Sequence, residues 1–307
     1  MTLAVVCSGQ GGQHPDMFAT LARMQAARPV LEHVAALTGL SVLDGPLDLA
    51  PGALAANRTA QILVAGHALA AHAELAAHGV EAAVFAGYSA GEIAAHGCAG
   101  ALDVGATLDL MAARGDAMDA ACEGAAVQGM LATIGLALAQ VEQLAQETGV
   151  FVAIVNGADH VVVGGATEAL DRFETAAAGR VRHLRRLSVQ IASHTPLLED
   201  AAPRFAEAVR MSGWRAPSVP VLSGVDGRAI RDKEEAAHFL ALQLHQRLDF
   251  RRCLECVFEY GATAVIELGP GRAMTRLIEE SFPDMTARAF EDFRTAAGAA
   301  KWALRRN

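Results

Sequence analysis

Short apolar runs alternate along this chain with longer segments in which apolar residues recur at helical intervals. Four of the runs have almost no polar positions, which is typical of strands buried on both faces of a sheet; they span residues 3–7, 82–87, 220–224 and 264–268. Apolar residues at three- and four-residue intervals predict helices near residues 15–26, 60–78, 103–122, 196–211, 234–246 and 271–280. The alternation predicts an α/β fold with a largely parallel sheet that is covered on both faces.

The middle of the chain has a different order of elements. Between about residues 125 and 192 the pattern predicts a strand, a helix, two strands joined by a short turn, a second helix and a final extended segment. This β-α-β-β-α-β order is typical of the ferredoxin-like arrangement. We therefore expect a ferredoxin-like subdomain of residues 125–192, inserted into a larger domain formed by residues 1–124 and 193–307.

The composition narrows the class of protein. A chain of 307 residues that is 52% hydrophobic can bury one large core or two smaller ones. Its formal net charge of −9 opposes binding to nucleic acid and to anionic membranes. The first residues do not form a signal-peptide pattern, and polar residues interrupt the alanine-rich stretch 60–77, so no membrane span is expected. We expect a soluble, cytoplasmic protein.

The five cysteines predict neither a disulfide framework nor a metal site. They are odd in number and widely spread. Cys253 and Cys256 have the spacing of a metal-ligand pair, but their segment has helical apolar spacing and no second pair accompanies it. Packing in the core is the better interpretation, and we expect no metal and no redox cofactor.

The sequence GYSAG, residues 87–91, places a serine between two glycines where an apolar strand ends and a helical segment begins. A strand followed by G-x-S-x-G and a helix is the nucleophile elbow of α/β-hydrolase-like folds, in which a tight turn exposes the serine above the sheet. Free N–H groups at the start of the helix can then stabilise an oxyanion as Ser89 is acylated. An ordinary glycine-rich turn, in which Ser89 caps a helix, is the alternative.

A serine nucleophile needs a base, and His194 is the best placed of the eleven histidines. It lies between a predicted strand and a predicted helix for which Thr195 is a suitable cap. The carboxyl ends of strands are where open α/β sheets bind ligands. A local capping or packing role for His194 is the alternative.

Two further features fit a site near the serine. The glycine-rich stretch SGQGGQ, residues 8–13, follows the first predicted strand, and its backbone could complete an oxyanion hole. Arg114 lies in an otherwise apolar helical segment. An arginine there either extends its head group to solvent or holds a carboxylate in a bidentate fork, and the first is the commoner case.

Together these motifs resemble the malonyl-CoA:acyl carrier protein transacylase family over nearly the whole chain. The resemblance runs in order through GQGGQ, GYSAGE, RGDAMDAA, VNGADHVVVGG, SVQIASHTPLLE, QLHQRLDF and ELGPGRAMTRL. It implies an α/β-hydrolase-like catalytic domain with the inserted ferredoxin-like subdomain. It also implies a two-step transfer of a malonyl group from malonyl-CoA, through a serine ester, to the phosphopantetheine-type thiol of an acyl carrier protein, with no metal or cofactor.

The resemblance gives the matched residues of the reacting centre a role each. It implies that Ser89 is the nucleophile and His194 its general base. The backbone carbonyl of Gln243 would orient His194, in the place that a hydrolase triad gives to an acid. The backbone N–H groups of Gln10 and Ala90 would form the oxyanion hole.

The resemblance also implies an acyl pocket. Arg114 would bind the free carboxylate of a malonyl group, and its planar fork suits that role. Gln61 matches a glutamine of the family's site, and Asn156 and Met130 match positions of the pocket wall.

Some matched positions depart from the usual family pattern. Tyr88 stands where the family usually has histidine, and Cys7-Ser8 stand where it often has Phe-Pro. The motif GYS-x-GE is more similar to the transacylase subunit of bacterial malonate decarboxylase. We therefore expect the acceptor to be the decarboxylase's carrier subunit, and other malonate decarboxylase subunits to be possible partners. The malonyl-CoA:acyl carrier protein transacylase of fatty acid or polyketide synthesis is the alternative.

A basic stretch could dock the carrier, because carrier proteins are usually acidic. It consists of Arg180, Arg182, Arg185 and Arg186. A solvated strand edge is the alternative interpretation, since edge strands often carry charge.

Two rival classes of function share part of this pattern. A serine esterase or thioesterase would have the same elbow but would need an acid between serine and histidine, for which Asp116, Asp119 and Asp159 are candidates. A non-catalytic acyl-CoA-binding or scaffold subunit is the second rival. The joint presence of the expected nucleophile, base and oxyanion residues argues against it.

Overall fold

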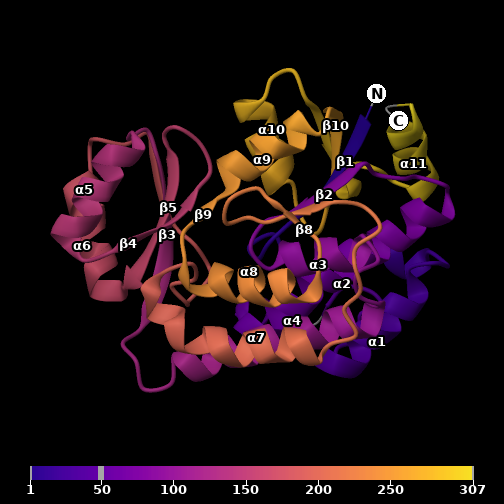
Figure 1. The fold of residues 1–307 in the computed structure, drawn as a ribbon, viewed down its shortest axis with the longest axis horizontal. Coiled ribbons are helices and arrows are strands. Elements are labelled where there is room, and N and C mark those ends of the chain that lie inside the picture. Colours follow the sequence, from indigo (N-terminus) through magenta and orange to yellow (C-terminus); the bar gives the residue numbers. More distant parts are fainter. Residues whose placement is uncertain (1, 48–51, 306–307) are drawn as a thin grey trace.

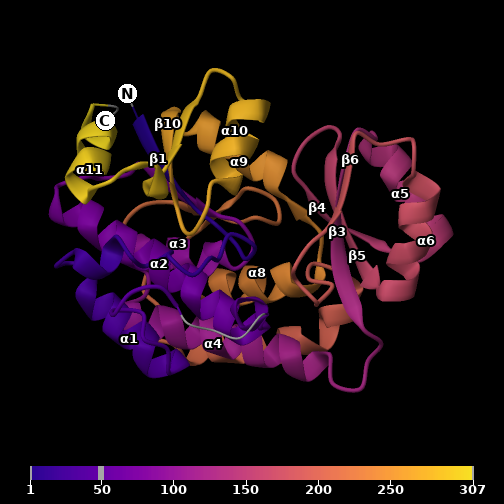
Figure 2. The same ribbon diagram turned by 180° about the vertical axis from the view of Figure 1, so that it is seen from behind.

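The computed structural model describes residues 2–47 and 52–305, and in it two sheets lie side by side with helices around them (Figure 1, Figure 2). The larger sheet has the strand order β11-β10-β1-β2-β7-β8. Its strands are β1 (Thr2–Cys7), β2 (Val84–Gly87), β7 (Val221–Leu222), β8 (Ala229–Ile230), β10 (Ala262–Leu268) and β11 (Thr286–Ala289). All neighbouring pairs are parallel except β7 with β8, so the prediction of a largely parallel sheet is confirmed.

Helices cover both faces of the larger sheet, because alternate residues of its strands enter two different cores. On β1, Leu3 and Val5 belong to one core, and Ala4 and Val6 belong to the other. The first core is closed by α1 (Arg28–Thr38), α2 (Asn57–Ala77), α3 (Gly91–Cys98), α4 (Val104–Ala121), α7 (Ala202–Met211), α8 (Lys233–His245) and α11 (Ala296–Leu304). The second core is closed by α9 (Phe250–Glu259) and α10 (Ala273–Ser281). This two-sided burial explains why the strands have almost no polar positions.

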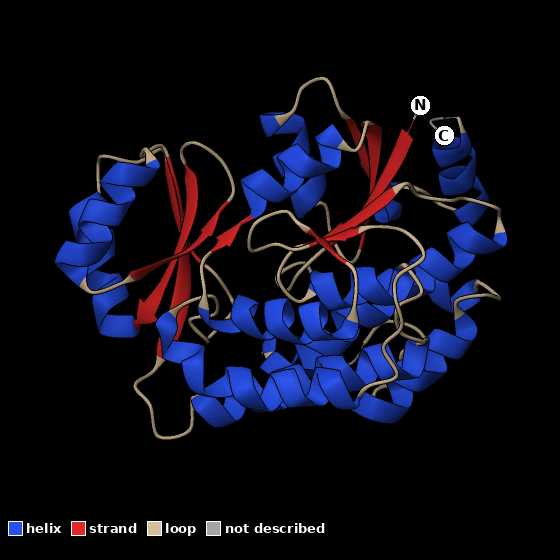
Figure 3. Cartoon of the chain, in the orientation of Figure 1, coloured by secondary structure: helices blue, strands red, loops and turns tan. Residues whose placement is uncertain are grey.

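The smaller sheet has the strand order β6-β3-β5-β4-β9 and stands apart from the larger one in Figure 3. The chain passes through β3 (Gln128–Ile134), α5 (Leu138–Thr148), β4 (Phe151–Val155), β5 (His160–Ala166), α6 (Thr167–Ala177) and β6 (His183–Arg186). That order of elements is the predicted one. The fifth strand, β9 (Leu248–Asp249), comes from outside residues 125–192 and pairs with β4 in parallel.

The two sheets are joined by a shared core. One face of the smaller sheet packs on α5 and α6. The other face contributes Met130, Ala153 and Ile154 to the core that α9 and α10 close over the larger sheet. Apolar contacts therefore hold the two sheets together.

Two local helix predictions are wrong. No α-helix spans residues 15–26; turns and the short 3-10 helix Leu21–Arg23 occupy that stretch, and α1 follows with Pro29 in its first turn. Phe18 in these turns and Leu21 in the 3-10 helix are both buried, so the stretch keeps the three-residue apolar interval that suggested a helix. The segment 196–211 is divided into the 3-10 helix Pro196–Ala201 and α7. The final extended segment, residues 181–192, contains the strand β6, which confirms a strand at that place.

Candidate active site

Ser89 stands on a strained turn between β2 and α3. Its φ of 54° is in the left-handed region, which is unfavourable for a residue with a Cβ atom. The two flanking glycines make the turn possible: a Cβ atom on Gly87 would lie 2.2 Å from the backbone N of Glu92, and one on Gly91 would lie 2.2 Å from the carbonyl O of Cys7. The expected elbow is therefore built from backbone contacts that admit no side chain at either glycine.

His194 is held against Ser89 by the end of α8. Its Nε2 lies 2.8 Å from the Ser89 Oγ, and its Nδ1 lies 2.5 Å from the carbonyl O of Gln243. The backbone N–H of His194 donates to the carbonyl O of Leu244 at 2.8 Å. Carbonyls in the last turn of a helix lack partners within the helix, so α8 offers these two acceptors without losing a bond of its own. The Nδ1–H donation leaves the Nε2 lone pair directed at the serine hydroxyl.

The environment of His194 keeps its ring neutral. Burial, the nearby charge of Arg114 and, in the opposite direction, the hydrogen bond to Gln243 together lower the pKa of His194 to about 3. The φ of His194 is 63°, and among the described residues only Ser89 and His194 have a positive φ without being glycine. Backbone strain therefore coincides with the two residues that the sequence selects as nucleophile and base. The predicted side-chain cap at Thr195 is wrong, since its hydroxyl donates to the carbonyl O of Ala192 at 2.6 Å.

Arg114 is fully buried beside the serine, so the interpretation that it reaches solvent is wrong. Its Nη1 donates to the Gln61 Oε1 at 2.8 Å, and its Nη2 lies 3.3 Å from the Ser89 Oγ and 3.2 Å from the Gln243 Oε1. Its Nε has no partner among the described residues. Burial lowers the pKa of Arg114 to about 10, which leaves the group positively charged at neutral pH. A buried, incompletely paired guanidinium next to the serine is suited to bind a carboxylate.

Gln61 on α2 fixes the orientation of this arginine. The Gln61 amide is buried, and its Nε2 donates to the Asn57 Oδ1 at 2.8 Å. Because the amide nitrogen is engaged there, the amide oxygen is left to accept from Arg114. Gln61 therefore contacts the arginine and does not face the serine directly.

The loop after β1 lies beside the serine because Cys7 at the end of β1 pairs with Gly87 at the end of β2. Among the described residues, no hydrogen bond is donated by the backbone N–H of Gln10 or of Ala90. The loop is fixed by the hydroxyl of Ser8, which donates to the buried carboxylate of Glu267 at 2.6 Å. Two free N–H groups at this edge are what an oxyanion hole requires.

A cavity of about 480 Å³ reaches the serine turn at Tyr88. Gln10, Tyr88 and Asn156 are among the residues that line it. Tyr88 packs edge-on against Phe250, and its hydroxyl lies near the Asn156 side chain. The place of Asn156 in the wall of an acyl pocket stays a prediction, because Ser89, His194 and Arg114 do not line this cavity. Met130 is not among the lining residues, because its side chain is packed in the core shared by the two sheets.

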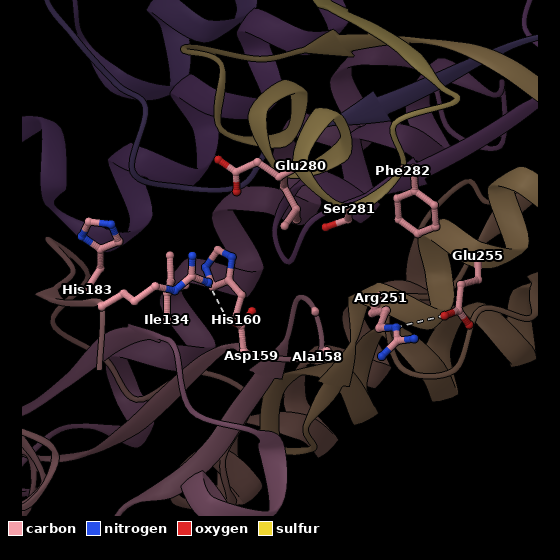
Figure 4. A pocket seen from close by; sticks show the side chains of 13 residues that line it. Ile134, Ala158, Asp159, His160, His183, Arg251, Glu255, Glu280, Ser281 and Phe282 are labelled. Atoms are coloured by element: carbon pink, nitrogen blue, oxygen red, sulfur yellow. Dashed lines mark hydrogen bonds and ion pairs between the residues drawn. The ribbon is translucent and has the colours of Figure 1, made fainter. Parts of the chain in front are cut away.

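A second cavity of about 520 Å³ adjoins the first and shares His160 and Leu277 with it (Figure 4). Its arginines are already paired, Arg182 with Asp159 and Arg251 with Glu255. Because its fixed charges are largely paired with one another, this cavity does not offer a concentrated site for phosphate groups.

A further buried carboxylate, Glu92, escapes the sequence analysis. It is the second residue of α3 and is fully buried. Its Oε2 accepts from the Gln243 Nε2 at 2.6 Å and from the backbone N–H of Gly224 at 2.9 Å. The only signal in the sequence is its place at the end of GYSAGE, which says nothing about its partners.

The acids proposed for a hydrolase triad lie elsewhere. Asp116 pairs with Arg58, Asp119 accepts from Asn57, and Asp159 pairs with Arg182. The Nδ1 of the histidine is instead bonded to a backbone carbonyl, as described above. The geometry therefore does not include the acid that the esterase reading needs.

The arrangement of possible metal ligands, the cysteines and the longest apolar helices can be described for residues 2–47 and 52–305. No group of three or more histidine, cysteine or acidic side chains is arranged there to hold a metal ion. All five cysteines are free thiols, and Cys253 and Cys256 are buried. No helix in this part of the chain has the length and hydropathy of a membrane span.

A serine and a histidine at the carboxyl edge of a parallel sheet, with two free N–H groups beside them, form the arrangement of serine-dependent acyl transfer. The chain belongs to the acyl transferase domain family, whose model matches residues 4–302.

Named relatives agree with this family. The malonyl CoA-acyl carrier protein transacylase of Escherichia coli O157:H7 is 32% identical over 96% of this chain and 98% of that protein. The solved malonyl-CoA:acyl carrier protein transacylase of Xanthomonas oryzae pv. oryzae is 30% identical, with a TM-score of 0.91 over 98% of this chain and 99% of that chain. A malonyl-transacylase solved with a type II polyketide synthase acyl carrier protein has 26% identity and a TM-score of 0.89 over the whole of both chains.

The serine turn yields a first prediction, in which Gly91→Ala is compared with Gly213→Ala. A Cβ atom on Gly91 meets backbone on the neighbouring strand, whereas one on Gly213 meets open space. Gly91→Ala should lower the free energy of unfolding by about 3 kcal/mol or more, and Gly213→Ala should change it by well under 1 kcal/mol. Urea unfolding followed by circular dichroism measures both. Equal stability of the two variants would contradict the account of the turn.

Proposed function

We propose that this protein is an acyl-carrier-protein S-malonyltransferase, which moves a malonyl group from malonyl-CoA to the phosphopantetheine thiol of a carrier protein. The observation that carries the proposal is the buried Arg114 guanidinium 3.3 Å from the Ser89 hydroxyl. Malonyl differs from acetyl by one free carboxylate, and a buried guanidinium next to the acylated atom is a partner for that group. The named relatives support the same activity.

In the first half-reaction the Ser89 oxygen attacks the thioester carbon while its proton moves to the Nε2 of His194. The negative charge that forms on the thioester oxygen is stabilised by the N–H groups of Gln10 and Ala90. The carbon–sulfur bond then breaks, and the sulfur of CoA leaves with the proton from His194. The product is a malonyl ester on Ser89 and free CoA.

In the second half-reaction the carrier thiol loses its proton to His194 and attacks the ester carbon. Collapse of the intermediate breaks the ester bond and returns the proton to the serine oxygen. The Gln243 carbonyl stabilises the imidazolium that forms in each half-reaction, because it accepts from Nδ1. No metal or redox cofactor takes part in this proposal.

The identity of the carrier is a narrower question. The relatives named above are transacylases that act with acyl carrier protein, and they favour the general reading over the malonate decarboxylase subunit. The decarboxylase carrier remains a narrower proposal that rests on Tyr88 in the motif GYSAGE. Incubating the malonyl-enzyme with each of the two carriers in parallel tests this proposal, because the preferred carrier should remove the malonyl group faster.

A cytoplasmic location of the protein likewise stays a prediction.

The nucleophile is tested by incubating the protein separately with malonyl-CoA and acetyl-CoA and reading its intact mass. We expect a malonyl adduct that maps to Ser89 and little acetyl adduct, because only malonyl offers Arg114 a carboxylate. Ser89→Ala should form neither adduct. Steady release of CoA without an adduct would indicate a thioesterase, and neither adduct nor release would contradict the proposed reaction.

The role of Arg114 is tested by Arg114→Met and Arg114→Lys. Loss of a charge-assisted pair with the acyl carboxylate should lower the rate of malonyl loading by about 10- to 100-fold, while acetyl loading changes far less. Lysine keeps the charge without the planar fork, so the malonyl-loading rate of Arg114→Lys should lie between those of the wild-type protein and Arg114→Met. Stopped-flow release of CoA gives both rates. An equal loss for the two donors would mean that Arg114 only supports the structure.

Of the four arginines in the basic stretch, two remain candidates for docking the carrier because they have no acidic partner among the described residues. Arg182 and Arg186 are paired with acidic side chains of the smaller sheet's layer. Arg185 lines the cavity of about 480 Å³, and it and Arg180 are exposed, with no ion pair among the described residues. We propose that Arg185 contacts the acidic carrier.

Arg185→Glu should therefore raise the KM for the carrier by about 5-fold or more and spare acylation by malonyl-CoA. Arg204→Glu, on the exposed side of α7 and away from the cavity lining, is the matched control. Steady-state transfer to the carrier measures both variants. Unchanged carrier kinetics in Arg185→Glu would rule out this contact.

A further inference from the structure

The site contains a buried negative charge for which acyl transfer has no direct use. Glu92 is 0% exposed, and only its Oε2 is hydrogen-bonded, to the Gln243 amide and the Gly224 N–H. Its Oε1 has no partner among the described residues. An ionised carboxylate that is buried and half satisfied is costly unless a positive charge compensates it.

That positive charge is the Arg114 guanidinium, which Glu92 meets through a single bridging amide. The Gln243 Nε2 donates to Glu92 at 2.6 Å, and the Gln243 Oε1 accepts from Arg114 at 3.2 Å. The two ends of the amide fit only this orientation, because a carboxylate accepts and a guanidinium donates. Glu92, Gln243 and Arg114 thus form an amide-bridged ion pair with no exposed member.

This pairing matters when a second carboxylate reaches Arg114. In a site that excludes water, two carboxylates near one guanidinium repel each other strongly. Resting on the proposed malonyl transfer, we infer that Glu92 determines acyl preference. In the empty site the ionised Glu92 balances the charge of Arg114. When the acyl carboxylate binds to Arg114, Glu92 takes up a proton from water.

The surroundings of Glu92 favour such a proton exchange. Burial and the neighbouring Asp226 raise the pKa of Glu92, against the hydrogen bonds and the charge of Arg114, to about 7. The unpartnered Oε1 provides a position for the proton. A further titratable group that interacts with Glu92 is the Cys253 thiol of α9, whose pKa is raised far above its usual range by burial and by this carboxylate.

The sign of the pH dependence follows from this arrangement. Below about pH 7 Glu92 is protonated, so Arg114 meets the malonyl carboxylate without competition. Above that pH the ionised Glu92 opposes the malonyl carboxylate but does not act on an acetyl group. Preference for malonyl over acetyl should therefore fall as the pH rises.

The test compares initial rates of Ser89 acylation by malonyl-CoA and by acetyl-CoA between about pH 6 and about pH 8.5. Because both donors use the same serine, base and oxyanion hole, the ratio of the two rates isolates the carboxylate. We expect this ratio to fall by about 3- to 10-fold over that range in the wild-type protein. In Glu92→Gln, which keeps an oxygen toward Gln243 but cannot ionise, the ratio should not change with pH.

Glu74→Gln is the matched control, because Glu74 is a buried carboxylate of α2 that accepts from the Ala27 N–H. It should keep the wild-type profile. A second readout is calorimetry of malonyl-CoA binding to Ser89→Ala at about pH 8, in two buffers of different ionisation enthalpy. It should show uptake of up to about one proton, and Ser89→Ala combined with Glu92→Gln should show none.

A wild-type ratio that does not change with pH would overturn the inference, as would a Glu92→Gln protein that keeps the wild-type slope. If Glu92→Gln does not fold, the wild-type profile and the calorimetry of Ser89→Ala decide alone. Failure of the proposed function is distinguishable, because the wild-type protein would then form no malonyl adduct at any pH. That result would overturn both proposals together.

Discussion

The active site is organised around the burial of one full positive charge. Arg114 lies where water does not reach, and its neighbours are arranged to make that possible. Gln61 from α2 and Gln243 from α8 each turn an amide oxygen toward it, and Glu92 supplies the opposite charge. The helices that carry these residues must therefore converge around Arg114, and the serine turn lies beside it. Removing Glu92 would leave the buried guanidinium without a counter-charge, and removing either amide would leave it with an unpaired N–H group.

Gln243 links that charge to the base. Its backbone carbonyl holds the His194 ring, while its side chain connects Arg114 to Glu92. One residue in the last turn of α8 therefore contacts both the proposed base, His194, and the proposed carboxylate-binding group, Arg114. A shift of this helix end would therefore disturb the contact with His194 and the contact with Arg114 at the same time. This arrangement suits a reaction in which one acyl group must meet both.

Much of the fold and the reacting pair could be predicted from local patterns, whereas the charge network could not. The serine turn is encoded by adjacent glycines and by a change of apolar period, and both are visible in sequence. Helical spacing does not distinguish a buried arginine from one that reaches solvent. The burial of Arg114 became evident only when the structure gave its partners. Glu92 and Gln243 are 151 positions apart, and no local pattern joins them. The two-residue strand β9 is likewise too short to have a period.

Ser89 and His194 both have a left-handed backbone conformation, which lowers the stability of the fold. Each costs on the order of 1 kcal/mol relative to glycine, which adopts that conformation freely. Glycine at either position would relieve the strain and remove the proposed nucleophile or the proposed base. Selection for heat resistance alone would therefore favour an inactive protein at these positions, and a thermostability screen of this chain must be coupled to turnover to avoid that outcome.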